Sequence, residues 1–93
     1  MKESRHNVYF AIDGERDYQD TLAEQRGWPK EGRVPAQSTG DYLVLLKVYI
    51  DRAMVAWTDN SGDLAALDVV RKVAGIAVHC MEDNGVVFRK AAK

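Results

Sequence analysis

Residues 38–85 read STGDYLVLLKVYIDRAMVAWTDNSGDLAALDVVRKVAGIAVHCMEDNG, and this stretch decides the fold. It holds two long runs with apolar residues at helical spacing, separated by the polar turn Asp59-Asn60-Ser61-Gly62-Asp63. The first run, about 39–58, follows a capping-box-like Ser38-Thr39-Gly40-Asp41, and the second, about 63–83, precedes Asn84-Gly85, where a left-handed C-cap fits. We therefore expect two helices that form an antiparallel hairpin.

The flanking segments predict one more helix and two irregular pieces. Ser4 is a good N-cap for a helix over about 4–26, which Gly27 and Pro29 end. Residues 27–38 hold two prolines and two glycines and predict a loop. In the tail, 84–93, the apolar Val86-Val87-Phe88 is expected to fold back on the hairpin. The chain of 93 residues thus predicts a single all-α domain, 1–93, with three main helices.

The two hairpin helices carry more apolar surface than one partner helix covers. In the run 63–83 the apolar residues occupy more than half of the helix circumference. In the run 39–58 one apolar face is joined by a second line, Val44, Val48 and Val55, roughly opposite. Because a chain of three helices has few faces left to cover this surface, we expect an oligomeric helical bundle built from copies of the chain.

Charge and composition exclude several classes of function. Thirteen Lys and Arg against 14 Asp and Glu leave no excess of positive charge for nucleic acid. The longest apolar run is broken by Lys47, Asp51 and Arg52, which predicts that the chain does not span a membrane. Cys80 is the single cysteine and no signal peptide is seen, so a cytoplasmic location is expected.

The apolar arc of the first helix contains a polar anomaly. Glu15 and Gln19 lie one turn apart near the middle of the arc, with Arg16 at its edge. Such groups require partners when they are held against apolar surface. One interpretation is an internal brace in which Glu15 meets Arg71, Lys72 or Lys47. The other is a ligand pocket floored by polar groups between helices.

Further candidate residues lie outside that helix. Trp28, with Lys30 nearby, could stack a base and meet phosphate, or could plug the core. Gly75 lies between Arg71 and His79 and allows close approach of a helix or a ligand.

Metal binding is not expected to be a main property of the chain. His79 and Cys80 point about 100° apart on a helix and cannot share a zinc ion, and His79 is expected to pair or cap near the helix end. Glu15 with Asp51 could form a two-carboxylate magnesium site, against the simpler interpretation that Asp51 is solvated. No catalytic residue and no resident cofactor is predicted. Magnesium is expected only if Glu15 and Asp51 form the two-carboxylate site.

Two segments resemble a known group of proteins: Glu15-Arg16-Asp17-Tyr18-Gln19-Asp20 and Arg71-Lys72-Val73-Ala74-Gly75-Ile76-Ala77-Val78-His79-Cys80-Met81-Glu82-Asp83-Asn84-Gly85. The pair is similar to short uncharacterised helical proteins of phages and prophages, some of them loosely labelled MazG-like after the all-α nucleoside triphosphate pyrophosphohydrolases. Those enzymes hold magnesium with Glu-x-x-Glu and Glu-x-x-Asp. This chain departs from that pattern, since Tyr18 follows Glu15 and Gly85 follows Glu82 at that spacing.

The resemblance implies a phage-type accessory protein that acts in the host cytoplasm, with anti-defence as one expected role. The leading expectation is a non-enzymatic homo-oligomer that binds or sequesters a nucleotide-like ligand. Its expected ligand residues are Glu15, Arg16, Tyr18, Gln19, Trp28, Lys30, Arg71 and His79. The alternatives are a reduced MazG-like pyrophosphohydrolase and an inhibitor that binds a host protein through the spare face of the 39–58 helix.

Overall fold

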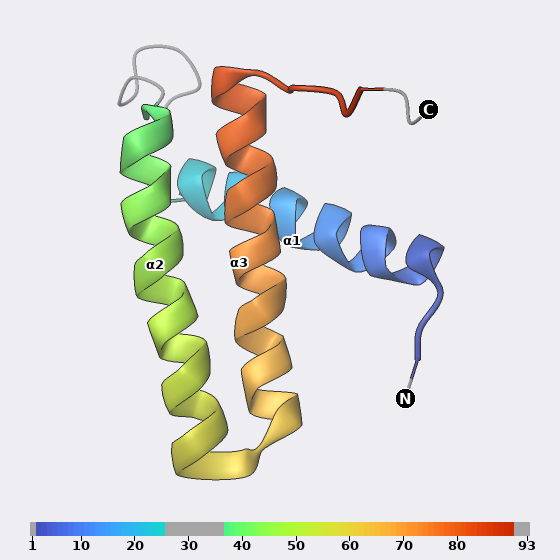
Figure 1. Ribbon diagram of the computed structural model, residues 1–93, viewed down its shortest axis with the longest axis vertical. Coiled ribbons are helices and arrows are strands. Elements are labelled where there is room, and N and C mark those ends of the chain that lie inside the picture. The colour runs from blue at the N-terminus through green and yellow to red at the C-terminus, as the bar shows by residue number, and fades with distance from the viewer. Residues whose placement is uncertain (1, 26–36, 91–93) are drawn as a thin grey trace.

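The computed structural model describes residues 2–25 and 37–90, and in these ranges the chain forms helices and no strand. In chain order the elements are α1 (Arg5–Gln25), α2 (Thr39–Ala56), a π-helical turn η1 (Trp57–Ser61) and α3 (Asp63–Asn84) (Figure 1). The predicted all-helical class and its three main helices are confirmed. The predicted loop over 27–38 lies almost entirely outside the described residues.

The ends of the helices follow the capping chemistry of the sequence. The Ser4 hydroxyl accepts a hydrogen bond from the Asn7 backbone N–H at 3.1 Å, at the start of α1. At the start of α2, Ser38 and Asp41 form a capping box in which each side chain accepts from the other residue's backbone N–H. Gly85 follows α3 with φ 110°, a conformation that favours glycine.

The connection between α2 and α3 differs from the prediction. The sequence predicts α2 up to about residue 58 and then an irregular turn, whereas the helix widens into η1 and continues to Ser61. The chain then leaves the helix at Gly62, whose φ of 71° places it in the region that glycine adopts without strain. The turn is therefore shorter than predicted, because one π-helical turn replaces most of it.

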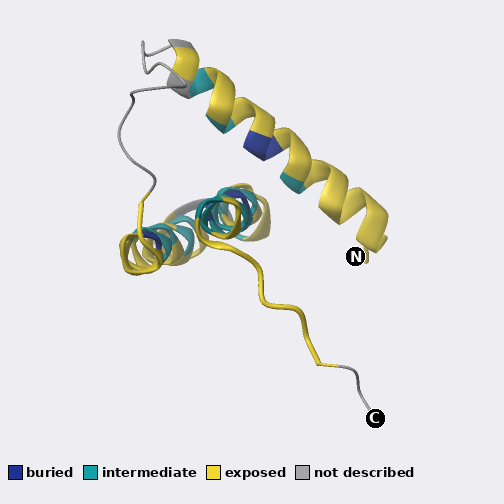
Figure 2. Ribbon diagram, turned by 90° about the horizontal axis from the view of Figure 1, so that it is seen from above, coloured by how far each residue is buried: buried dark blue, intermediate teal, exposed yellow. Residues whose placement is uncertain are grey.

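The helices pack as a close pair with a third helix laid across it. Figure 1 shows α2 and α3 side by side, with η1 joining their lower ends, and α1 crossing behind α3. Within the described residues α1 contacts α3 and makes no contact with α2 (Figure 2). The buried apolar side chains in this part of the chain are Tyr42 on α2 and Ile76 on α3. The small apolar core therefore lies between α2 and α3, and α1 packs on one side of this pair.

This core is small for a chain of 10.4 kDa. The chain exposes 7609 Å², roughly 2,200 Å² more than the about 5,400 Å² of a compact monomer of this mass. Its radius of gyration is 15.1 Å, against about 12 Å for a compact domain of this length. The prediction that the apolar tail folds back on the hairpin is wrong, because Val87 and Phe88 extend into solvent and are 96% and 85% exposed.

None of the helices in the described ranges is long and apolar enough to cross a membrane.

Candidate functional site

A cluster of charged and polar side chains occupies the place where α1 crosses α3. We call it the crossing cluster. Its members are Glu15, Arg16, Gln19 and Asp20 from α1, and Asp68, Arg71 and Glu82 from α3.

Glu15 is the buried carboxylate of the crossing cluster. Its side chain is 6% exposed and accepts a hydrogen bond from Arg71 Nε at 2.9 Å. Its second oxygen accepts from Gln19 Nε2 at 3.0 Å, one turn further along α1. Arg71 also pairs with Asp68 at 2.8 Å through Nη1. The predicted brace between Glu15 and Arg71 is confirmed, and the other two candidates pair elsewhere, Lys72 with Asp68 and Lys47 with Asp51.

Arg16 is the buried cation of the same cluster, and each of its three side-chain nitrogens donates to another side chain. Nε and Nη2 donate to Glu82 on α3 at 3.1 and 2.6 Å, Nη2 also to Asp20 at 3.0 Å, and Nη1 to Gln19 at 3.2 Å. Burial lowers the pKa of Arg16, but the hydrogen bonds to Glu82 and Asp20 outweigh burial and raise it. The guanidinium therefore stays charged at any physiological pH.

The two ion pairs lie on either side of Gly75 of α3. A Cβ at this position would lie 2.8 Å from Cγ of Glu15 and 2.9 Å from Nε2 of Gln19. The expected close approach at Gly75 is thus made by α1. Glycine lowers the stability of a helix interior by about 1 kcal/mol relative to alanine. At this position it creates the space in which α1 lies on α3.

The crossing cluster is complete without a ligand. Among the described residues no buried side-chain nitrogen or oxygen lacks a hydrogen-bond partner. Its two guanidinium groups and Lys72, which pairs with Asp68, face four carboxylates, so the site has no excess of positive charge to offer a phosphate. What the arrangement does chemically is fix the angle between α1 and α3.

The other predicted ligand residues do not gather at this place. Tyr18 is 59% exposed on another side of α1. His79 lies on α3 toward α2, where its ring packs on Tyr42 with centroids 5.4 Å apart. Trp28 and Lys30 lie outside the described residues. The structure thus brings together Glu15, Arg16, Gln19 and Arg71, and not Tyr18 or His79.

A second polar group, between α2 and α3, was missed by sequence reasoning. The Tyr42 hydroxyl donates a hydrogen bond to Asp83, and His79 Nε2 lies 3.7 Å from the same carboxylate. His79 thus pairs near the end of its helix as expected. The signal available in the sequence was the spacing of His79 and Asp83 by four residues, but it gives no indication of Tyr42, which lies 41 residues away.

Burial, and then the hydrogen bond to Asp83, raise the pKa of Tyr42 well above its ordinary value. Tyr42→Phe is expected to lower the free energy of unfolding by about 1–2 kcal/mol at pH 7, because the Asp83 carboxylate loses a donor. The contribution is fully present below about pH 10, where the unfolded tyrosine starts to lose its proton, and is lost as pH rises further. Urea unfolding at pH 7 and pH 11 measures both effects.

Tyr9→Phe is the matched control for that comparison, since Tyr9 is 63% exposed. It is expected to change the free energy of unfolding by less than about 0.5 kcal/mol at pH 7. A Tyr42→Phe difference that stays the same at pH 11 would contradict the hydrogen-bonding role.

The carboxylates considered for magnesium are far apart in the fold. Glu15 pairs with α3, whereas Asp51 lies on α2, which α1 does not contact in the described ranges, and pairs with Lys47 at 3.4 Å. Nor do three or more His, Cys, Asp or Glu side chains of residues 2–25 and 37–90 form a group that could hold a metal ion. Within the described residues, Glu15 and Asp51 therefore do not come together as the two-carboxylate site.

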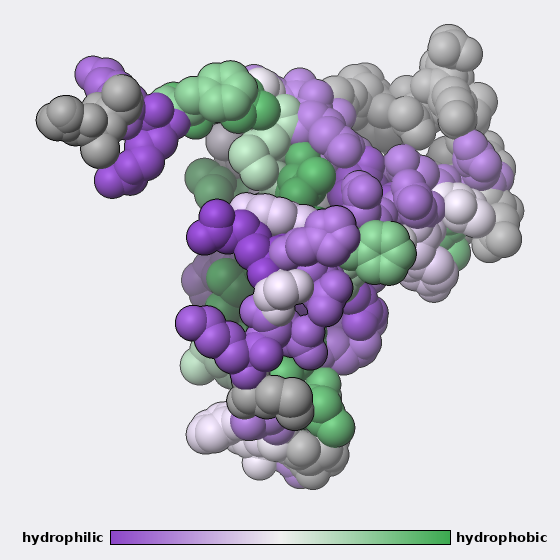
Figure 3. Space-filling model, turned by 90° about the vertical axis from the view of Figure 1, so that its right-hand side faces the viewer, coloured by the Kyte–Doolittle hydropathy of each residue, from purple (hydrophilic) through white to green (hydrophobic). Residues whose placement is uncertain are grey.

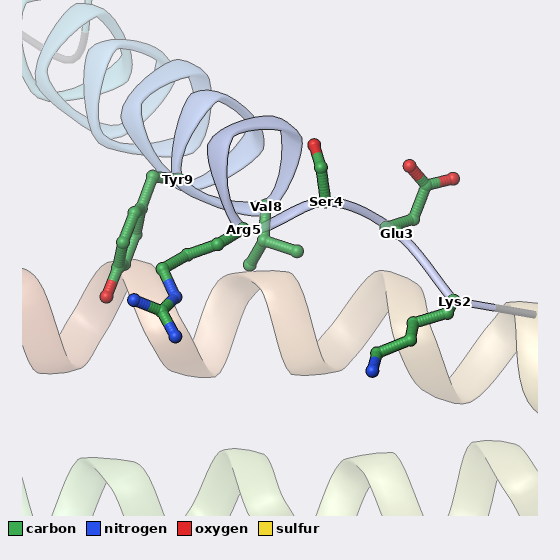
Figure 4. A pocket seen from close by; sticks show the side chains of 6 residues that line it. All are labelled: Lys2, Glu3, Ser4, Arg5, Val8 and Tyr9. Carbon is green, nitrogen blue, oxygen red and sulfur yellow. The ribbon is translucent and has the colours of Figure 1, made fainter.

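A shallow, open hollow lies at the start of α1, away from the crossing cluster. It is lined by Lys2, Glu3, Ser4, Arg5, Val8 and Tyr9. Figure 4 shows the side chains of Lys2, Arg5 and Tyr9 directed to one side of this segment, and those of Glu3 and Ser4 to the other. None of the predicted ligand residues lines it, and its polar groups do not converge on one point.

Comparison with known proteins adds no further information on the site. No family model matches the chain, and no curated protein and no solved structure is significantly similar to it. The roles of its residues therefore rest on the geometry described above.

Proposed function

We propose that this protein is a non-enzymatic binding protein that works through protein–protein contacts: it self-associates, and it holds a protein partner on α2. In the phage-type setting that the sequence resemblance implies, that partner is a host protein bound in the host cytoplasm. The observation that carries the proposal is an exposed apolar line on α2, Val44, Val48 and Val55, which we call the valine line.

The valine line has the spacing of a helix-binding surface. Its residues recur with Asp51 at intervals of four, three and four, so that they lie along one edge of the helix. This edge is turned away from the side of α2 that carries the buried Tyr42 against α3. All three valines are more than 40% exposed. A partner that presents apolar side chains and one basic group opposite Asp51 matches this surface.

The proposal is tested by capture of a partner with Val48→Asp and a matched control. Val48→Asp places a charge in the middle of the valine line and is expected to remove a stoichiometric partner from affinity-purified complexes. Leu64→Asp also replaces an exposed apolar side chain with an acid, but on α3 and outside the line, and is expected to retain the partner. Equal capture by both variants, measured by native mass spectrometry, would refute the valine line as the binding surface.

Binding of a nucleotide-like ligand is the second candidate. One observation favours it: Arg16, Gln19 and Arg71, three of the predicted ligand residues, meet at the crossing cluster. The same groups already hold four carboxylates, which makes this candidate the weaker one. A ligand would have to displace Asp20, Asp68 or Glu82, the three acids of this set that are at least half exposed, to reach a guanidinium.

A thermal-shift screen with nucleotides and cyclic nucleotides separates the two candidates. Stabilisation that is lost in Arg71→Met would favour the ligand. No shift with any nucleotide, together with a partner lost in Val48→Asp, would leave protein binding as the function.

A further inference from the structure

The surface of the α2–α3 pair that faces away from α1 is apolar on both helices. On α3, Leu67, Val70 and Met81 are exposed, and they fall on one line with Ala74 and Ala77 at intervals of three and four residues. This spacing is that of a coiled-coil seam, and no charged residue interrupts it between Leu67 and Met81. Arg71 and Gly75, which face α1, lie about 100° away around the same helix.

A second line of exposed apolar residues runs along α2. Ile50, Met54 and Trp57 are each between 47% and 61% exposed and follow one another at intervals of four and three. Trp57 Nε1 donates a hydrogen bond to Asp63 at 3.1 Å, and Asp63 is the first residue of α3, on the same line as Leu67 and Val70. The α2 line and the α3 line therefore lie on the same side of the pair. We call this two-helix surface the open face.

The figures agree with this placement. In Figure 2 α1 lies on one side of the α2–α3 pair, and the tail leaves α3 on the opposite side. In Figure 3 several apolar side chains appear at the left-hand edge, below the tail and between hydrophilic ones, whereas hydrophilic side chains cover much of the middle of the view. The open face is thus distinct both from the crossing cluster and from the valine line.

The size of the exposed surface indicates what covers it. The chain exposes roughly 2,200 Å² more than a compact monomer of its mass. A standard interface removes about 800 Å² from each partner, which is less than this excess over the whole chain. The buried apolar core of the described residues consists of Tyr42 and Ile76, so burial of the open face against another surface would add substantially to it. A second copy of the same chain is always available as a partner when the chain folds.

We propose that a second copy of this chain packs on the open face, so that two α2–α3 pairs form a four-helix arrangement with α1 on its outside. Ala74 and Ala77, in the middle of the α3 line, let the facing helices approach closely. The isologous contact buries the α2 line and the α3 line of both copies together. This inference specifies the self-association of the proposed function and does not depend on its protein partner.

Light scattering of the purified full chain, with variants on the two apolar surfaces, tests the inference. The wild type is expected at twice the 10.4 kDa mass of one chain. Val70→Glu and Met54→Glu, one on each helix of the open face, are expected at half the wild-type mass. Val48→Glu, on the valine line, is expected to keep the wild-type mass. A monomeric wild type, or open-face variants of wild-type mass, would overturn the proposal.

Fluorescence provides a second readout in case the separated chains unfold. In a Trp28→Phe background Trp57 is the single tryptophan, because the chain has two. Its emission is expected to shift to longer wavelength, and its quenching by acrylamide to increase, when the protein is diluted through its dimer dissociation constant. Emission that does not change over the concentration range in which the mass changes would overturn the open face as the interface.

The two proposals fail in different experiments. Loss of partner capture with an unchanged dimer in Val48→Asp supports the valine line and leaves the open face intact. A dimer that is lost in Val48→Glu but kept in Val70→Glu would place the contact between copies on the valine line and overturn the inference.

Discussion

Arg71→Met is expected to lower the free energy of unfolding by about 2 kcal/mol, because it leaves the Glu15 carboxylate buried with the Gln19 amide as its remaining partner. Loss of one partner from a fully buried ion pair costs about 3–5 kcal/mol. The value expected here is smaller because 38% of the Arg71 side chain is exposed. Urea denaturation followed by far-ultraviolet circular dichroism measures it at a fixed protein concentration.

The double variant Glu15→Met/Arg71→Met is the control for this prediction. It removes both charges and fills their space with apolar side chains, and it is expected to recover most of the lost stability. Equal destabilisation in the single and the double variant would contradict the ion-pair explanation and indicate that shape alone determines the fit of α1. A single variant of wild-type stability would show that Glu15 is not buried in solution.

Gly75→Val is expected to release α1 from α3 and to lower the free energy of unfolding by about 2–3 kcal/mol. The added side chain overlaps Cγ of Glu15 and Nε2 of Gln19, and overpacking of this kind costs about 1–3 kcal/mol, to which the loss of the crossing cluster adds. Because α1 contacts only α3 within the described residues, α2 and α3 are expected to stay paired. Amide hydrogen exchange is the measurement, with protection lost over residues 5–25 and kept in α2 and α3.

Gly14→Ala provides the matched comparison. Gly14 is exposed in the middle of α1, and a Cβ there meets no atom within 4 Å. Alanine is expected to raise the free energy of unfolding by about 0.5–1 kcal/mol through helix propensity alone. If Gly75→Ala stabilised the protein as much as Gly14→Ala does, α1 would not lie on α3 at this glycine.

The sequence predicts the helices well because their signals are local. Apolar spacing together with Ser4, Ser38 and Asp41 predicts where α1, α2 and α3 begin to within a residue. The π-helical form of η1 was not predicted, because the polar residues 59–63 satisfy the pattern of an irregular turn equally well. The position of the tail was predicted wrongly. Its apolar residues indicate that the segment is stabilised by a covering surface, but they do not indicate that the same chain provides that surface.

The crossing cluster was predicted in part. A carboxylate in the apolar arc of a helix requires a cation, and Arg71 was one of three candidates that the sequence offered for Glu15. The pair of Arg16 with Glu82, 66 residues apart, depends on the angle at which α1 crosses α3, and helical periodicity does not contain that angle. For the same reason the sequence indicates close approach at Gly75 but does not distinguish a helix from a ligand.

The two pairs on either side of Gly75 also determine how α1 can move. The ion pairs Glu15–Arg71 and Arg16–Glu82 join α1 to α3 at two separate points. A rotation of α1 about the crossing point would therefore have to break at least one of these pairs. From Glu15 back to Arg5 the helix extends about 15 Å beyond these two ion pairs. The direction of the first half of α1 relative to the α2–α3 pair is therefore fixed. A molecule that binds the exposed Tyr9 and Phe10 is held in one orientation relative to that pair.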